Sequence, residues 1–429
     1  MTDSQLTLER VYKEHSARIL ATLVRLFGPR NLELAEDVLQ EAFRKALVAW
    51  QEQGVPENPA AWIVTAAKRH AIDTVRAQRT QRKFSDELSS QLESGWTLTH
   101  TVEQEFDEAR IVDHQLRMIF MCANADVPAD NRIPLMLRTL CGFGLPAISR
   151  ALLLPEATIK KRLVRTREKL RGYAFEFPAQ DKLPSVMDSV HTVLYLLFNE
   201  GFHSTDEARA MNLELCREAI HLATLLVAEP RVVNRDTLGL LALMQFHLAR
   251  AASRVDERGD NVPIDQQDRT RWDAEAIAAA ARWVALADNV VSSATDRFYI
   301  EAKIAEQHCR VARFEDTDWA VIVDWYAAMV NTTNSPLAAL NRAVALGYAG
   351  KHAAAVEQVA SVIEHDALRG SHMPSAVLAH VAALAGDADK ARHYANESCS
   401  RGGSAREQRA LHEQIERLLA RAPVRGAQQ

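Results

Sequence analysis

The chain has 429 residues, of which 48 % are hydrophobic and 25 % charged, and its formal net charge is −5 at pH 7. This is the balance of a soluble globular protein too long for one core, and it suits about two to four domains. No apolar run approaches the roughly 20 residues that cross a bilayer, the first residues lack the layout of a signal peptide, and the five cysteines are scattered. We therefore expect a cytoplasmic protein with no membrane contact, metal site or cofactor.

Basic and acidic residues are unevenly distributed along the chain. Residues 1–175 carry 25 Lys and Arg against 22 Asp and Glu, whereas residues 176–429 carry 26 against 34. Within the first part, six basic residues fall in 68–83, none falls in 84–109 and seven fall in 152–172. Local basic patches rather than net charge indicate nucleic-acid binding, although one patch alone is more often a solvated helix face.

The first 83 residues are predicted to be helical, because apolar residues recur at spacings of three and four. In residues 31–52 one face is apolar. The opposite face carries polar residues edged by an aromatic one: Asp37, Gln40, Glu41, Arg44 and Phe43. No histidine or nucleophile accompanies the two carboxylates, which argues against acid–base chemistry. The face suits docking of a partner helix, and the alternative is a solvated surface.

A further helix is predicted over residues 58–83, opened by Pro59. Trp62 is interpreted as a core residue, because aromatic side chains usually pack inward. The helix also carries a set of basic side chains: Lys68, Arg69, Arg76, Arg79 and Arg82. Residues 84–109, with seven acids and no base, lack a sustained amphipathic period and are predicted to be a linker.

A short helix, a tight turn and a basic helix are predicted over residues 145–172. In the basic helix one stripe would face a small core: Ile159, Leu163, Thr166 and Leu170. Basic residues project from the other side. This is the helix-turn-helix pattern, in which the second helix enters the major groove of DNA. The alternative is a helical hairpin with a solvated basic face.

The remainder, 184–429, is rich in Ala and Leu and reads as helices joined by short turns. "NRAVALGYAGKHAAAV" (341–356) is similar to "AHVAALAGDADKARHY" (379–394), and Gly350 and Gly386 open equivalent turns 36 residues apart. Helical hairpins at this period are typical of tetratricopeptide (TPR) arrays. We therefore predict an all-α protein that ends in a TPR-like helical array.

Three segments together resemble a known family. "AEDVLQEAFRKALVAW", "NPAAWIVTAAKRHAIDTVR" and "PEATIKKRLVRTREKL" are similar to regions 2.2, 2.3–2.4 and 4.2 of extracytoplasmic-function (ECF) sigma factors of RNA polymerase, in the same order. The resemblance covers residues 5–173. It implies a domain 2 helical bundle over 1–83, an acidic linker over 84–109 and a domain 4 helix-turn-helix over 110–176. The extension, with "LYLLFNEGFH" and "QQDRTRWD", resembles the subgroup that carries a large helical C-terminal domain.

The resemblance implies core RNA polymerase and promoter DNA as partners, with contacts to the β′ clamp helices and the β flap. Residues that would dock on the clamp helices are Asp37, Gln40, Glu41, Phe43 and Arg44. Residues that would contact the −10 element are Asn58, Lys68, Arg69, Arg76 and Arg79; Arg69 stands where many relatives have asparagine. Residues that would contact the −35 element are Thr158, Lys160, Lys161, Val164 and Arg165. The acidic linker corresponds to the segment that threads the polymerase near its RNA exit path.

The role of residues 184–429 stays open between two hypotheses. They form a regulatory module that contacts the sigma domains or polymerase, or they bind a separate regulatory protein or small ligand as a signal. A protein of another class, a DNA-binding regulator with a TPR sensor, would use only the 145–172 segment and would not require 31–83. We expect no enzymatic activity, because no acid–base pair or phosphate-binding loop is present.

Overall fold

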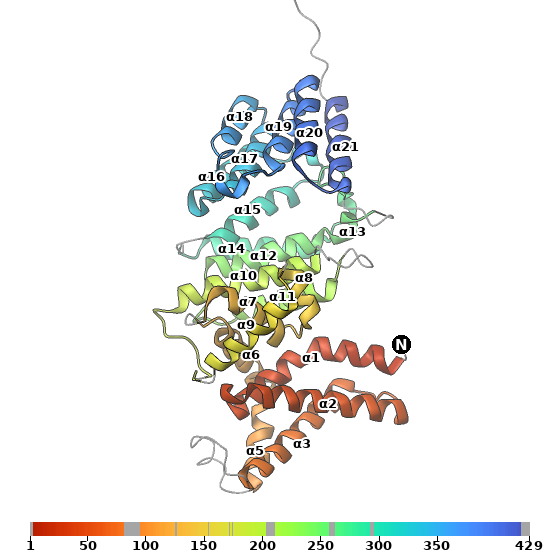
Figure 1. Ribbon diagram of the computed structural model, residues 1–429, viewed down its shortest axis with the longest axis vertical. Coiled ribbons are helices and arrows are strands. Elements are labelled where there is room, and N and C mark those ends of the chain that lie inside the picture. The colour runs from red at the N-terminus through yellow and green to blue at the C-terminus, as the bar shows by residue number, and fades with distance from the viewer. Residues whose placement is uncertain are drawn as a thin grey trace, which may run out of the picture. The chain divides into compact units, whose positions relative to one another are not determined.

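Figure 1 shows the computed structural model of the chain, which describes residues 3–80, 95–124, 127–152, 154–170, 172–173, 175–202, 211–256, 262–291 and 296–421. Every secondary-structure element in these ranges is a helix, as predicted. The chain divides into two compact units, unit 1 (Met1–Val232) and unit 2 (Val233–Gln429), and each is described by itself. None of the described helices has the length and apolar character needed to cross a membrane.

Unit 1 begins with three long helices, α1 (Asp3–Phe27), α2 (Leu32–Gln53) and α3 (Pro59–Thr80), with a short 3-10 turn, η1 (Pro29–Asn31), after α1. Each of the three helices packs against the other two. Trp50 is fully buried in their core, and its ring meets Trp62 edge-on at 5.9 Å. The breaks between the helices are at Gly28 and Gly54, whose φ angles of 78° and 83° favour glycine.

The structure differs from the prediction of a linker over 84–109. Residues 81–94 lie outside the described residues, but the second half forms α5 (Gly95–Glu105), which packs against α1, α3 and α6. Val102 and Phe106 anchor it and are 0 % and 6 % exposed. Val102 and Phe106 are four positions apart and therefore lie on the same face, the one that packs against the other helices.

The other helices of unit 1 are α6 (Glu108–Cys122), α7 (Ala129–Thr139), α8 (Leu145–Leu152), α9 (Glu156–Leu170), α10 (Leu183–Phe202) and α11 (Leu213–Val227). We predicted a domain boundary near residue 184, but α10 packs against α6 and α7, and α11 packs against α6. The buried Arg132 of α7 donates to the Ser189 hydroxyl of α10 at 2.5 Å. The boundary therefore falls at Val232, because the first two helices of the extension complete the core of unit 1.

Unit 2 contains α12 (Arg235–Ala249), α13 (Ala251–Arg254), α14 (Ala274–Asp288), α15 (Arg297–Cys309), α16 (Trp319–Thr333), α17 (Pro336–Tyr348), α18 (His352–Ala360), α19 (Met373–Leu384), α20 (Ala388–Arg401) and α21 (Ala405–Arg421). The 3-10 turns η2 (Arg269–Arg271), η3 (Phe314–Asp316) and η4 (Asp366–Leu368) connect some of them. Several helices start at a side chain that accepts a hydrogen bond from the first turn: Asn234, Asp273, Asp318, Ser335 and Asp387.

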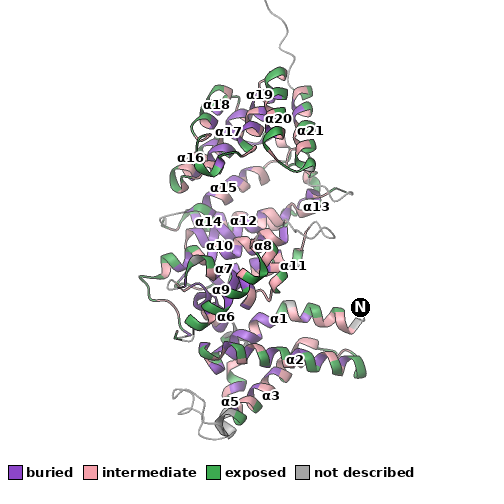
Figure 2. Cartoon of the chain, viewed as in Figure 1, coloured by how far each residue is buried: buried purple, intermediate pink, exposed green. Residues whose placement is uncertain are grey.

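Helix α12 is the central helix of the first half of unit 2, and most of its length is buried (Figure 2). It packs against both α14 and α15. A Cβ atom added to Gly239 would lie 2.4 Å from the backbone N and Cα of Tyr299. The absence of a side chain at Gly239 therefore allows the backbones of α12 and α15 to touch.

Two hairpins, α17–α18 and α19–α20, contain the pair of similar segments found in the sequence. Gly350 and Gly386 have φ angles of 74° and 76°. The amide of Lys351 donates to the Leu346 carbonyl at 2.9 Å, and the amide of Asp387 donates to the Ala382 carbonyl at 3.0 Å. Helices α17 and α19 therefore end in the same type of C-cap, which needs a glycine at a positive φ. The repetition of the hairpin is observed, whereas the assignment of the whole unit as TPR-like stays a prediction.

Candidate nucleic-acid and partner interface

The polar face predicted on α2 is largely exposed. Asp37, Gln40 and Arg44 are exposed, and Glu41 is partly exposed. The Arg44 guanidinium donates two hydrogen bonds to the Glu41 carboxylate, at 2.6 and 2.7 Å. These bonds lower the pKa of Glu41, which keeps the carboxylate charged. The face is thus a row of charged and amide groups in water that a partner's polar groups can reach.

Phe43 does not share this exposure. Its side chain is only 7 % exposed and packs edge-to-face against Tyr12 of α1, with 4.9 Å between ring centres. The sequence placed Phe43 at the edge of the polar face, but α1 covers that edge. In this structure Phe43 is therefore not available to a partner, unlike the polar side chains of the same face.

The basic residues predicted on α3 lie within one sector of the helix, because successive residues are about 100° apart. Arg69 and Arg76 are exposed, and the Lys68 ammonium is 5.5 Å from the centre of the Phe106 ring, next to the end of α5. The side chain of Arg79 lies outside the described residues. Asn58 caps the helix, since its side-chain oxygen accepts from the Ala61 amide at 3.0 Å.

Helix α9 has the two faces that the sequence predicts. The buried stripe is confirmed: Ile159, Leu163, Thr166 and Leu170. The opposite side exposes Lys160, Lys161, Val164 and Arg165, while Thr158 in the first turn is half-buried. The side chain of Val164 is 48 % exposed. The Ser149 hydroxyl of α8 donates to the Leu154 carbonyl at 2.6 Å and fixes the turn into α9.

An ion pair that the sequence did not reveal joins α2 to α9. The Arg167 guanidinium donates to the Glu36 carboxylate at 2.7 Å, although the two residues are 131 positions apart. Burial raises the pKa of Glu36, and the charge of Arg167 opposes that shift. Helical periodicity shows which residues share a face of one helix, but it does not show which residues pair between distant helices. This ion pair is therefore visible only in the tertiary structure.

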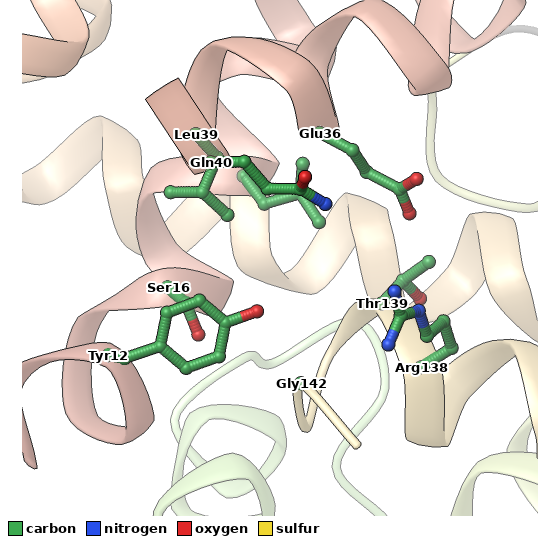
Figure 3. A pocket seen from close by; sticks show the side chains of 9 residues that line it. Tyr12, Ser16, Glu36, Leu39, Gln40, Arg138, Thr139 and Gly142 are labelled. Carbon is green, nitrogen blue, oxygen red and sulfur yellow. The ribbon is translucent and has the colours of Figure 1, made fainter. Parts of the chain in front are cut away.

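A small pocket lies beside this ion pair, between the three-helix bundle and α7 (Figure 3). Tyr12, Ser16 and Gln40 line one side, and Arg138, Thr139 and Gly142 line the other. Gln40, predicted to contact polymerase, is exposed and also lines the rim of this pocket.

Comparison with family models assigns two segments. The model described as Sigma-70 region 2 matches residues 11–81, which are α1 to α3. A model described as a family of unknown function (DUF6596) matches residues 186–288, which run from α10 to α14. Helix α9 lies outside both segments, so the helix-turn-helix assignment stays a prediction.

Two curated proteins are similar to the chain. The ECF RNA polymerase sigma factor SigW of Bacillus subtilis is 25 % identical over 38 % of this chain and 83 % of its own length. An uncharacterized protein of Rhizobium meliloti, R00370, is 35 % identical over 76 % of each chain. The chain therefore contains a sigma-70 region 2, is similar over part of its length to an ECF sigma factor, and carries a helical extension that includes the DUF6596 segment.

No solved structure matches the chain. The sigma-factor family is non-enzymatic, so the polar residues of α2 and α3 are considered as binding groups only. In the described ranges, no group of three or more His, Cys, Asp or Glu side chains could hold a metal ion.

Proposed function

We propose that this sigma-family protein binds core RNA polymerase, directs it to promoters through the −10 and −35 elements, and is regulated by its C-terminal helices. The observation that carries the proposal is the coincidence of the region 2 match with a bundle whose α2 presents Asp37, Gln40 and Arg44 to solvent. SigW, named as an RNA polymerase sigma factor, supports the same function.

Core polymerase binding is assigned to the exposed face of α2. Replacing Asp37 and Arg44 together by alanine removes charged groups that would pair with the polymerase, and we expect about a tenfold loss of affinity for the core enzyme. The matched control is Glu52→Ala, an exposed acidic residue at the end of the same helix. Equal affinity of the double variant and the wild type in a core-binding titration would contradict this assignment.

DNA recognition is assigned to the basic sector of α3 for the −10 element and to the exposed face of α9 for the −35 element. On α9, a lysine that contacts phosphate and one that contacts a base edge have different effects when removed. If Lys160 or Lys161 binds a phosphate, its replacement by alanine reduces the salt dependence of promoter binding by about one unit of slope. The exposed Lys351 of unit 2 provides a control with the same charge change.

Run-off transcription with core polymerase tests the function as a whole. We expect promoter-specific transcripts only when the protein and core enzyme are both present. A regulator that used only the 145–172 segment would instead bind promoter DNA tightly without polymerase, and that result would replace the present proposal.

Regulation is assigned to unit 2 rather than to the whole extension, because α10 and α11 belong to the core of unit 1. A chain ending at Val232 keeps that core, whereas a chain ending at residue 183 exposes the buried surfaces of α6 and α7. We therefore expect the chain ending at Val232 to fold and to change promoter-specific activity. Unchanged activity of that chain would exclude a regulatory role for unit 2.

A further inference from the structure

Two arginines of unit 2, Arg250 and Arg269, approach the same aromatic ring and make no ion pair among the residues that the structure describes. The guanidinium carbon of Arg269 is 4.6 Å from the centre of the Trp272 ring, and that of Arg250 is 5.8 Å away. Other arginines of the unit do have carboxylate partners: Arg235 pairs with Asp296 and Arg313 with Asp316. Arg269 and Trp272 belong to the "QQDRTRWD" segment, to which the proposed function gives no role.

Hydrogen bonds hold both guanidinium groups in place, but each group keeps N–H donors that have no acceptor among the described residues. Arg269 uses Nη1 to donate to the carbonyls of His308 and Val311, the second at 2.9 Å. Arg250 uses Nη2 in a 2.8 Å hydrogen bond with Nδ1 of His247. The Nε of Arg250 and the Nη2 of Arg269 are shielded from solvent and have no hydrogen-bond partner in the described part of the chain. Shielded charged donors without an acceptor are costly, and proteins usually satisfy them.

Nearby ionisable groups do not neutralise the two positive charges. Burial raises the pKa of the Cys309 thiol to about 11, so it is not an anion at pH 7. Burial lowers the pKa of His308 to about 3, so it is neutral. The exposed Glu315 and Asp316 act on Arg269 from a distance but form no ion pair with it. Two cations thus share a partly buried site without a counter-ion in the described ranges, which is unfavourable until an anion binds.

We propose that Arg250, Arg269 and Trp272 form a binding site for an oxyanion, the phosphate or carboxylate group of a ligand. Guanidinium groups bind such anions with paired hydrogen bonds, and an aromatic face keeps the guanidinium planes in position. The inference concerns unit 2 alone and does not depend on the sigma-factor function.

An aromatic surface adjoins the arginine pair and can contact the rest of the ligand. The ring of His308, whose carbonyl accepts from Arg269, lies 5.4 Å from that of Trp319. Trp319 and Tyr348 stack with 4.3 Å between ring centres and 14° between planes. Both side chains are only half-buried. The ligand class is therefore an organic anion with an apolar or aromatic part next to the charged group.

Calorimetric melting of the full chain in inorganic phosphate, against chloride at equal ionic strength, tests the site. Ligands that bind the folded state raise Tm, so we expect phosphate to raise the Tm of the wild type. The increase should be lost in Arg250→Gln and Arg269→Gln and kept in Arg369→Gln, which removes an exposed arginine of the same unit. Since each variant is compared with itself in the two salts, a change in its intrinsic stability does not obscure the result.

A purely structural role predicts a different outcome. If the arginines serve only to stack on Trp272, the glutamine variants melt at lower temperature in both salts by the same amount, and phosphate has no specific effect. That result would overturn the proposal, as would a phosphate-induced increase that persists in both glutamine variants. Arg250→Lys, which keeps the charge without the planar fork, should show a reduced phosphate effect. A hexaglutamate peptide in place of phosphate distinguishes a carboxylate source, because only a peptide-binding site responds more strongly to the peptide.

Discussion

Unit 1 and unit 2 are both helical, and a polar pair in the first and a backbone contact in the second show two ways in which helices are held together. In unit 1, polar pairs join helices distant in sequence, such as Arg167 with Glu36 and Arg18 with His221 at 3.1 Å. In unit 2, the absence of a side chain at Gly239 allows the backbone of α12 to meet that of α15. A polar side chain can leave its intramolecular partner and pair with a polar group of another molecule. A contact between two backbones leaves no space for an added atom. The first arrangement therefore suits domains that separate and rebind, and the second suits a fixed framework.

The largest expected effect comes from breaking the backbone contact in unit 2. In Gly239→Ala the new Cβ meets backbone atoms of Tyr299 at 2.4 Å, and no rotamer relieves the clash. We expect α12 and α15 to separate, which should lower the free energy of unfolding of unit 2 by about 3 kcal/mol. Urea unfolding should show this loss, whereas Gly144→Ala in unit 1, where the nearest atom is 3.6 Å from the new Cβ, should change little. Equal stability of Gly239→Ala and Gly144→Ala would mean that the backbones of α12 and α15 are not in tight contact at Gly239.

A buried carboxylate provides the next test of the same framework. Asp236 is 3 % exposed, and its Oδ1 accepts from the amides of Phe298 and Tyr299 at 2.6 and 3.0 Å. Asp236→Ala leaves these buried donors unsatisfied and should destabilise unit 2 by about 2–3 kcal/mol, measured by urea unfolding. Asp273→Ala, which removes the exposed cap of α14, should cost about 1 kcal/mol. A smaller loss for Asp236→Ala than for Asp273→Ala would contradict this ranking.

A polar group of unit 1 gives a smaller effect that depends on pH. Burial raises the pKa of Glu218 on α11 from 4.5 to about 7, and the charge of Arg18 opposes the shift. A raised pKa means that the folded state favours the protonated acid. The contribution of Glu218 to the stability of the folded state is therefore complete below about pH 4.5 and is lost as the pH rises through about 7.

Glu218→Gln resembles the protonated acid at every pH. At pH 8 it should exceed the wild type in stability by about 2 kcal/mol, and at pH 4.5 the two should agree. Glu229→Gln removes a carboxylate whose pKa Arg231 holds low, so it should not increase stability at pH 8. Parallel pH profiles of unfolding for Glu218→Gln and the wild type would show that Glu218 is ionised in the folded chain.

Local features of the fold could be predicted from the sequence, because helical periodicity reports which residues share a face. The buried stripe of α9 was predicted residue by residue and is confirmed, and the two similar hairpins of unit 2 were identified from their glycines. The burial of Phe43 could not be predicted, since it depends on Tyr12 of another helix. The domain boundary was misplaced for a similar reason: α10 and α11 look like the helices that follow them, and only their packing assigns them to unit 1.

For the candidate sites the same distinction holds. The exposed side chains of α2, α3 and α9 were found from their helical faces, although their roles stay predictions. The pairing of Glu36 with Arg167 joins residues 131 positions apart, and Arg250 reaches the Trp272 ring from a different helix. A sequence without a set of relatives carries no signal for such contacts.

The ion pair between Glu36 and Arg167 sets a geometric requirement on the promoter binding that we propose. Elements centred at −10 and −35 are about 25 base pairs apart, which is about 85 Å along straight DNA. If α3 and α9 bind one element each, α2 and α9 cannot remain 2.7 Å apart at this pair. If the chain binds polymerase and promoter DNA as proposed, part of the free energy of that binding is used to break the contact between Glu36 and Arg167.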